Sequence, residues 1–210
     1  MPQRFLSVTG FVLAGGASRR MGRDKTQLRL GGQTLAARQV RLLEAVCRSA
    51  AVIGPAGSLR GLDVPVIPDE LPGHGPLGGI YTGLRHARTE LNLFLGCDMP
   101  FMEARFLHYL CARALAARPD VAIPETPHHG LQPLSAVYTR RALAAVRASL
   151  ASGDNQVSGV YSRVRCLVLP WREIARGRFA PRLFTNLNTP QDFEDAKRRI
   201  EGAAFRQLDA

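Results

Sequence analysis

The sequence predicts an α/β fold, a three-layer Rossmann-like arrangement around a mostly parallel sheet, and three observations lead to that prediction. Short apolar runs alternate with longer stretches of helical periodicity along the 210 residues, as in strands joined by crossover helices. The chain is 46% hydrophobic and 21% charged, which is typical of a globular protein and excludes disordered or collagen-like classes. No low-complexity linker or repeat interrupts it, so residues 1–210 are expected to form a single domain.

The first half of the chain gives the clearer pattern of elements. Its strand candidates are short apolar, β-branched runs closed by glycine, proline or polar residues. Its helix candidates carry apolar residues three and four positions apart, with charged residues on the other face. We expect strands at 8–13, 51–53, 64–67 and 91–95, and helices at 35–46 and 79–88.

The second half repeats the alternation less regularly. A Leu/Ala-rich helix ends before Pro119, because the residue before a proline disfavours helical geometry. The last helix begins with Pro190 in its first turn, where proline is well tolerated. We expect helices at 104–117, 140–150 and 190–201, and strands at 121–123, 134–138 and 165–169.

The charge of the chain points to anionic partners. Lys and Arg total 28 against 17 Asp and Glu, a formal net charge of +11. Such a field attracts nucleic acids, acidic membranes or small phosphorylated ligands. The basic residues are spread out and lack the aromatic interleaving of single-strand binders or a recognisable DNA-binding motif. We therefore expect no nucleic-acid partner. A non-enzymatic nucleic-acid binder is the alternative from a different functional class.

Apolar and cysteine patterns suggest an ordinary cytoplasmic chain. No run approaches the ~20 apolar residues of a membrane helix, and the first ten residues lack the features of a leader peptide. The four cysteines are scattered, so we expect buried thiols with neither a disulfide framework nor a zinc site. No membrane association is expected.

The first candidate site follows strand 8–13 directly. Residues 13–25 read LAGGASRRMGRDK, so glycines that allow close backbone approach precede Arg19, Arg20 and Lys25. Backbone N–H groups and cations together suit a triphosphate. The glycine spacing matches neither the dinucleotide fingerprint nor a Walker A loop, and the alternative is a flexible basic turn.

The second candidate is Asp98, in the segment LGCDMP that follows strand 91–95. Ligands of open α/β sheets bind at the carboxyl ends of the strands, so this carboxylate is expected to face the crevice beside the basic loop. Mg²⁺ uses one or two protein carboxylates and completes its octahedron with phosphate and water. Asp98 is therefore a candidate ligand of a Mg²⁺–triphosphate, the alternative being a helix cap.

A third loop carries Asp69 and the segment GHGPLGG at 73–79. It follows strand 64–67 and opens the next helix, so its backbone groups are placed to hold a base or a ribose. This signal is weak on its own, because Gly/Pro loops are common.

Together these segments resemble the molybdenum cofactor guanylyltransferases, nucleotidyltransferases with a glycosyltransferase-A-like fold. The resemblance runs from about residue 8 to 195. The motifs that carry it are LAGGASRRMGRDK (13–25), GPLGG (75–79), GCDMP (96–100), QPLSAVY (132–138) and NLNTPQD (186–192). The first motif and GCDMP are shared with sugar-nucleotide and cytidylyl relatives, whereas Asn186-x-Asn188-Thr-Pro favours the guanylyl branch.

The resemblance implies transfer of GMP from GTP to the phosphate of molybdenum-molybdopterin, with release of pyrophosphate and Mg²⁺ as cofactor. It implies catalytic roles for Arg20, Lys25 and Asp98, with Asp98 holding the metal. Asn186 and Asn188 correspond to the pterin side, and molybdoenzyme-maturation proteins are implied partners. The residues that it implies for nucleotide binding are Leu13, Ala14, Gly15, Gly16, Lys25, Gly54, Asp69, Pro76, Leu77 and Asp98.

One departure from the family concerns the acceptor. Many members carry a basic residue after the Gly-acid pair that here is Gly153-Asp154, and it is thought to help hold the pterin. This chain has Asn155 and Gln156 there, so Arg163 or Arg165 is considered as a substitute.

The nearest alternative is a cytidylyltransferase or a sugar-phosphate nucleotidyltransferase of the same fold. The loops are of the guanylyl type, and Gly15 lacks the Cβ that would crowd a purine. We therefore expect GTP to be used well and CTP poorly. The acceptor phosphate is already ionised, so catalysis should rest on positioning and charge neutralisation rather than on a general base.

Overall fold

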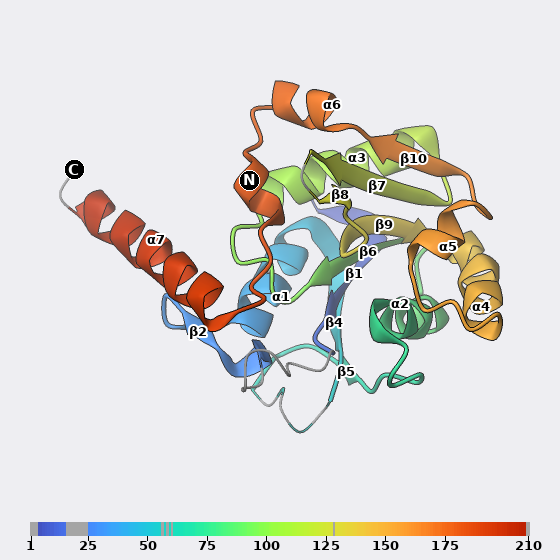
Figure 1. Ribbon diagram of the computed structural model, residues 1–210, viewed down its shortest axis with the longest axis horizontal. Helices are drawn as coiled ribbons and strands as arrows, with labels where there is room; N and C mark the ends of the chain where they lie inside the picture. The colour runs from blue at the N-terminus through green and yellow to red at the C-terminus, as the bar shows by residue number, and fades with distance from the viewer. Residues whose placement is uncertain are drawn as a thin grey trace.

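The computed structural model of the protein describes residues 4–15, 25–55, 57, 59, 61–127 and 129–208, with side chains as far as residue 202. In this part of the chain, eight strands form one sheet with helices on both faces, and two further strands form a hairpin (Figure 1). The predicted three-layer α/β architecture is confirmed.

The order of strands predicts a crevice beside the first one. Strand β9 is antiparallel to both of its neighbours, and all the other pairs along the main path are parallel. β4, the next strand of this sheet along the chain, lies on one side of β1, and β6 lies on the other, so the topological switch point is at β1. The order is β5 (Val66–Ile67), β4 (Cys47–Ile53), β1 (Phe5–Leu13), β6 (Leu91–Gly96), β9 (Ser135–Thr139), β7 (Val121–Thr126) and β10 (Cys166–Leu169), with β8 (Gly130–Leu131) paired to β7.

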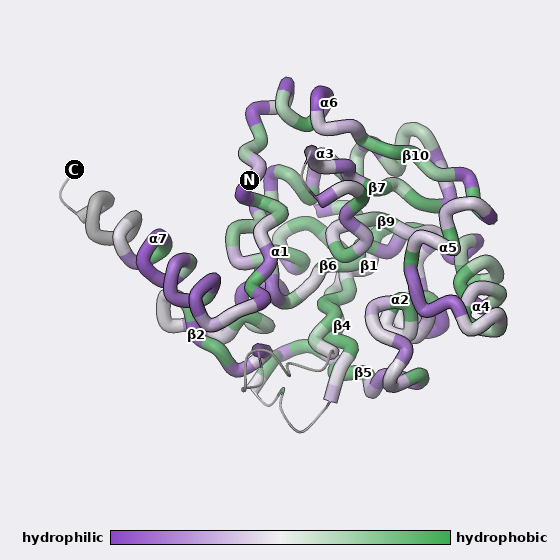
Figure 2. The backbone as a smooth tube through the Cα atoms, in the orientation of Figure 1, coloured by the Kyte–Doolittle hydropathy of each residue, from purple (hydrophilic) through white to green (hydrophobic). Residues whose placement is uncertain are grey.

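Each face of the sheet has its own hydrophobic core, because side chains alternate along a strand. On β1, Val8 and Val12 point to α1 (Leu35–Val46) and α3 (Ala104–Ala117). Phe11 on the same strand joins the core beneath α2 (Gly75–His86) and α4 (Leu143–Ala151). Burial on both faces explains the nearly continuous apolar colour of the central strands in Figure 2.

Two glycines let helices approach the sheet closely. A Cβ on Gly10 would lie 2.9 Å from the Cβ of Leu43 on α1, and one on Gly83 of α2 would lie 2.5 Å from Phe94 Cε1. Because the sheet backbone and the aromatic ring cannot yield that far, a side chain at either position would push its helix away from the sheet.

Two predicted helical segments need correction, and the strand expected at 51–53 begins at Cys47. The helix expected at 79–88 begins one turn earlier, at Gly75, so the GPLGG segment is its first turn rather than a loop. Its glycines hide the helical signal, although Pro76 is well placed in a first turn. The segment expected as one helix at 140–150 is a 3₁₀ turn, Arg140–Ala142, followed by α4.

A hairpin that the sequence analysis missed leads into α1. Strands β2 (Arg29–Leu30) and β3 (Gln33–Thr34) are joined by Gly31 and Gly32, whose φ angles are +56° and +79°. Two positive φ angles are what the favoured two-residue hairpin loop requires, and the Gly-Gly pair is its sequence signal. Thr34 then caps α1 by accepting the N–H of Ala37 at 3.2 Å.

The terminal helix α7 (Pro190–Leu208) begins where predicted and runs further, away from the sheet (Figure 1). Thr189 and Asp192 cap it reciprocally: the Thr189 hydroxyl accepts the N–H of Asp192, and the Asp192 carboxylate accepts those of Asn188 and Thr189. These backbone N–H groups lower the pKa of Asp192. Two short helices, α5 (Ser158–Tyr161) and α6 (Trp171–Arg176), were not predicted.

Three of the four cysteines are buried, as predicted. Cys47, Cys97 and Cys111 are buried, Cys166 is half-buried, and no disulfide joins these four described residues. Burial raises the pKa of Cys47 to about 12, which keeps it a thiol. Among the helices that the structure describes, none is long and apolar enough to span a membrane.

Candidate functional site

The carboxyl ends of the central strands meet at one edge of the sheet, as the topology requires. The N–H of Ala14 donates to the carbonyl of Ile53 at 2.8 Å, and the N–H of Cys97 donates to the carbonyl of Leu13 at 3.1 Å. The loops that follow β1, β4 and β6 therefore begin side by side. These loops emerge at the edge of the sheet where the sequence predicts the site.

Lys25 and Asp98 meet at this edge although 73 positions separate them in the chain. Lys25 Nζ lies 3.4 Å from Asp98 Oδ2, and the side chains are 17% and 22% exposed. Lys25 begins the 3₁₀ turn η1 (Lys25–Gln27), and Asp98 follows β6. The alternative that Asp98 caps the next helix is wrong, because the N-cap of α3 is Glu103.

The donor set around Asp98 fits Mg²⁺ better than a metal held by protein ligands alone. Within the described residues, no three His, Cys, Asp or Glu side chains cluster to hold a metal. A hard cation here would take a carboxylate oxygen from Asp98 and most of its other ligands from phosphate and water, as Mg²⁺ commonly does. Lys25 would share the same phosphate charge.

The NLNTPQD segment lies against the Asp98 loop. The N–H of Leu187 donates to the carbonyl of Asp98 at 2.9 Å, and the Leu187 side chain is fully buried. Asn186 and Asn188 on either side are exposed. The apolar Leu187 side chain is thus buried while the two amide side chains face outward, and both predicted acceptor residues lie next to the Lys25–Asp98 pair.

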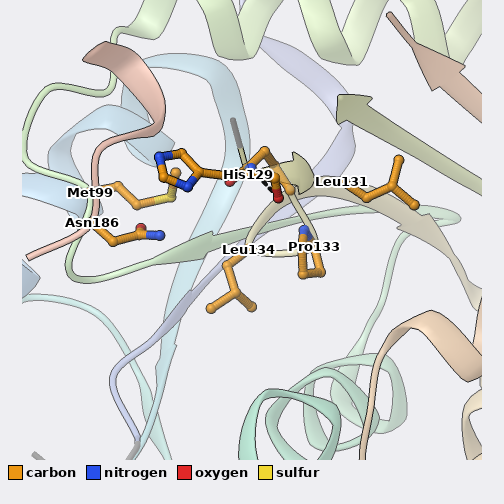
Figure 3. A pocket seen from close by; sticks show the side chains of 7 residues that line it. Met99, His129, Leu131, Pro133, Leu134 and Asn186 are labelled. Carbon is orange, nitrogen blue, oxygen red and sulfur yellow. Dashed lines mark hydrogen bonds between the residues drawn. The ribbon is translucent and has the colours of Figure 1, made fainter. Parts of the chain in front are cut away.

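A pocket of about 210 Å³ opens beside this segment. Its lining mixes apolar side chains with a few hydrogen-bonding groups, as ligand pockets do. Figure 3 shows Asn186 and His129 on the same side of the pocket as Met99. The lining residues are Met99, His129, Leu131, Gln132, Pro133, Leu134 and Asn186.

Several residues predicted to bind nucleotide have side chains or backbone groups already engaged in the fold. Leu77 is fully buried in the core, so only its backbone can meet a ligand, while Pro76 is exposed in the first turn of α2. Gly54 is buried, and a Cβ there would lie 3.1 Å from the Ala14 carbonyl oxygen. Close packing at the sheet edge therefore explains this glycine without a ligand.

Asp69 structures the loop that enters α2. Its Oδ1 accepts the N–H of Leu71 at 3.0 Å, and the Thr82 hydroxyl lies 3.0 Å from the same oxygen. No contact among the described residues joins this carboxylate to Lys25 or Asp98. The third predicted segment, a second wall of the predicted crevice, therefore shares no side-chain hydrogen bond or ion pair with the Lys25–Asp98 pair within the described residues.

The end of β1 offers a backbone surface. Leu13 and Ala14 are buried, and the Leu13 carbonyl and the Ala14 N–H are used in the sheet. Gly15 is exposed, and a Cβ there would meet no atom of the described residues within 4 Å. Gly16 and the predicted catalytic Arg20 lie outside the described residues.

The structure corrects the suggestion about the acceptor charge. Arg165 donates its backbone N–H to Asp120 at 3.0 Å and its guanidinium to the Arg118 carbonyl, just before β10 and β7 begin. That is the amino edge of the sheet, opposite the site, so Arg165 cannot replace the basic residue absent from the acceptor side. Arg163 likewise precedes β10.

The position expected to hold that basic residue has another contact. Asn155 Oδ1 lies 2.7 Å from Nδ1 of His74, the residue immediately before α2. This bond joins the 153–156 loop to the wall that Asp69 structures. Asn155 therefore belongs to the scaffold around α2 in this chain.

Sequence reasoning missed the pocket residues and a pair of contacts from α1. His129 is one of two consecutive histidines, and Gln132 belongs to the QPLSAVY motif, yet neither pattern indicated a role. Arg38 and Gln39 bind the carbonyls after Asp98. Gln39 had a readable signal, because it is a polar residue on the apolar face between Leu35 and Leu43.

Known proteins resemble this chain over nearly its full length. A family model described as the MobA-like NTP transferase domain matches residues 10–166. A "Probable molybdenum cofactor guanylyltransferase" of Pelotomaculum thermopropionicum is 34% identical over 200 residues, covering 94% of this chain and 96% of its own. The "Molybdenum cofactor guanylyltransferase" of Syntrophotalea carbinolica is 32% identical over 198 residues, covering 92% of each chain.

A solved structure shows the same fold. Molybdopterin-guanine dinucleotide biosynthesis protein A from Archaeoglobus fulgidus superimposes with a TM-score of 0.80 at 24% identity. The match covers 92% of this chain and 99% of that one. The predicted nucleotidyltransferase-type fold is confirmed.

Proposed function

We propose, because this chain belongs to the MobA-like NTP transferase domain family, that it transfers GMP from GTP to the phosphate of molybdenum-molybdopterin and releases pyrophosphate. Relatives named as molybdenum cofactor guanylyltransferases match it over nearly its full length. The observation that carries the proposal is the Lys25–Asp98 pair, at the switch point where such a fold binds its ligand.

In the proposed reaction the protein positions two phosphorylated substrates and neutralises their charge. A Mg²⁺ held by Asp98 would supply electrostatic stabilisation to the triphosphate. Lys25 binds phosphate oxygens and stabilises the charge that develops on departing pyrophosphate. The acceptor phosphate is the nucleophile and is ionised at neutral pH, so no side chain has to remove a proton.

The acceptor occupies the pocket beside Asp98. The Asn186 and His129 side chains offer hydrogen-bonding groups, and Met99 with the prolyl and leucyl side chains offers apolar surface. The amide nitrogen of Gln132 is already used within the pocket wall, where it donates to Thr126 Oγ1 and to the His129 and Gly130 carbonyls. The volume suits part of a pterin-sized group rather than the whole cofactor. The Leu187–Asp98 backbone bond couples the pocket wall to the metal-binding loop.

The base is read mainly by backbone groups. Gly15 presents open main chain, and no side chain that the structure describes caps the first N–H groups of α2. A Gly15→Ala substitution meets no protein atom among the described residues, so any loss of GTP use would report contact with the nucleotide. We expect it to reduce GTP discrimination by roughly 1–3 kcal/mol without improving ATP use.

The deciding experiment measures the initial rate of pyrophosphate release from GTP, CTP or ATP, each with Mg²⁺ and molybdenum-molybdopterin. The proposal predicts turnover with GTP and little with CTP. A CTP rate equal to or above the GTP rate would overturn the guanylyl assignment in favour of a cytidylyltransferase. Omitting the acceptor is the control that excludes simple hydrolysis.

Three finer points complete the proposal. The reaction depends on Mg²⁺, the protein works in the cytoplasm, and it meets molybdoenzyme-maturation proteins. The net charge of +11 supports substrates phosphorylated on both sides. Salt-sensitive binding of duplex DNA by the purified protein would instead favour the nucleic-acid alternative.

A further inference from the structure

Two consecutive residues of α1 hold the loop that carries Asp98. Gln39 Nε2 donates to the carbonyl of Met99 at 2.7 Å, and Arg38 Nε donates to that of Pro100 at 2.8 Å. The accepting carbonyls are those of the two residues directly after Asp98. With Leu187 bonded to the Asp98 carbonyl, three consecutive carbonyl groups of this loop are fixed.

Packing alone does not account for a glutamine at this position. Gln39 is fully buried, and its Oε1 accepts no hydrogen bond from a described residue. An amide buried with one group unsatisfied destabilises a fold relative to an apolar side chain of similar volume. Leu35 and Leu43, one turn away on either side, show that this face of α1 otherwise packs apolar side chains.

The same helix also positions the Lys25 side of the pair. The N–H of Leu35, the first residue of α1, donates to the carbonyl of Leu28 at 2.9 Å. The N–H of Leu28 donates in turn to the carbonyl of Lys25 at 3.2 Å. One helix therefore sets where both Lys25 and Asp98 lie.

We infer that Gln39, with Arg38 beside it, is a positioning residue that holds Asp98 at the distance from Lys25 that the reaction requires. It acts through the Met99 carbonyl, so it also fixes the residue whose side chain lines the acceptor pocket. The role in turnover rests on the proposed function. The mechanical part, that the Gln39 amide orders the loop after β6, does not.

The test compares two buried amides that bind carbonyls at opposite ends of β6. Gln39→Met keeps the shape of the side chain and removes its donor. Asn92→Leu is the matched control, because Asn92 is also fully buried and donates to the carbonyls of Thr89 and Glu90 at the far end of the strand. Arg38→Met is a second probe, at a half-buried position where unfolding is not expected.

The first readout is hydrogen exchange of the Leu187 N–H in the full chain, without GTP or acceptor. Referenced to the most protected amides of β1, exchange should be about tenfold faster in Gln39→Met, as expected for one lost hydrogen bond in a local opening. Arg38→Met should show a smaller increase. Asn92→Leu should leave the exchange rate of Leu187 relative to the β1 amides unchanged even if it lowers global stability.

The second readout is binding of Mn²⁺ as a probe of the metal position, measured by its EPR signal with GTP present. Gln39→Met should weaken this binding several-fold and lower kcat, with little change in the KM for GTP. Wild-type exchange at Leu187 in both variants, or the same change in Asn92→Leu, would overturn the positioning role. Faster exchange in a protein that does not use GTP would leave the role standing and count against the proposed function instead.

Discussion

Two walls of the crevice differ in how their residues are used. On one wall, Lys25 and Asp98 come from distant segments, and their side chains meet at 3.4 Å; among the described residues, the hydrogen bond and ion pair of each side chain are with the other. On the other, Asp69 is engaged within its own loop and Leu77 is fully buried. Under the proposed function, the first wall would act through side chains, whereas the second would offer a preformed backbone surface.

The largest effect should come from Asp98→Asn. The amide is a poor ligand for Mg²⁺, so turnover should fall on the order of 10³-fold or more while the fold persists. Pyrophosphate release at saturating GTP measures the loss, and circular dichroism checks the fold. Full activity of the purified variant at ordinary Mg²⁺ would show that the metal is held elsewhere.

Lys25→Ala should be the next most damaging change. Loss of one charge-stabilising donor from a closed site should lower kcat/KM by roughly 2–4 kcal/mol in transition-state stabilisation. The decrease should appear in kcat as well as in the KM for GTP, because the charge it neutralises grows in the transition state. Steady-state rates within twofold of wild type would show that Lys25 is a surface charge with no role in the reaction.

On the second wall, Asp69→Ala should affect stability more than chemistry. The variant loses the acceptor for Leu71 and Thr82, which should lower the free energy of unfolding by about 1–2 kcal/mol. We expect the KM for GTP to rise while kcat stays within about threefold of wild type. The exposed Asp63→Ala is the control, and a collapse of kcat in Asp69→Ala alone would assign that carboxylate to the reaction.

The smallest effect concerns the cap beside the acceptor wall. The pKa of Asp192 is lower in the folded than in the unfolded chain, so its stabilisation is present above the ordinary carboxyl pKa of about 3.9 and is lost as pH falls through the folded value. Asp192→Asn should therefore lower stability near pH 7, by less than about 1 kcal/mol because solvent screens an accessible charge. The free energies of unfolding of the two proteins, measured with urea, should converge as the solution becomes acidic.

The elements on each side of the crevice were unequally predictable from the sequence. The strands around β1 and the helices at 35–46 and 104–117 follow from apolar periodicity, because both faces of a parallel sheet are buried. The start of α2 did not follow, since glycines obscure its first turn. The Gly31-Gly32 hairpin was readable but missed.

The candidate site was predictable where a loop follows a strand. Lys25 and Asp98 come from the segments after β1 and β6, and the carboxyl ends of these two parallel strands lie side by side. The roles of Gln39, His129 and Gln132 depend on which carbonyl or cavity lies opposite each side chain. That information is tertiary, and a single sequence holds only hints of it, such as one amide on an apolar helix face.

The central claim, that Lys25 and Asp98 act as one unit on the nucleotide phosphates, is tested most directly by a double-mutant cycle. The rates of pyrophosphate release from GTP with molybdenum-molybdopterin would be compared for wild type, Lys25→Ala, Asp98→Asn and the double variant. Residues that act as a unit give strongly non-additive losses, so the double variant should be scarcely slower than Asp98→Asn alone. Losses that add in full, as for independent sites, would contradict the account.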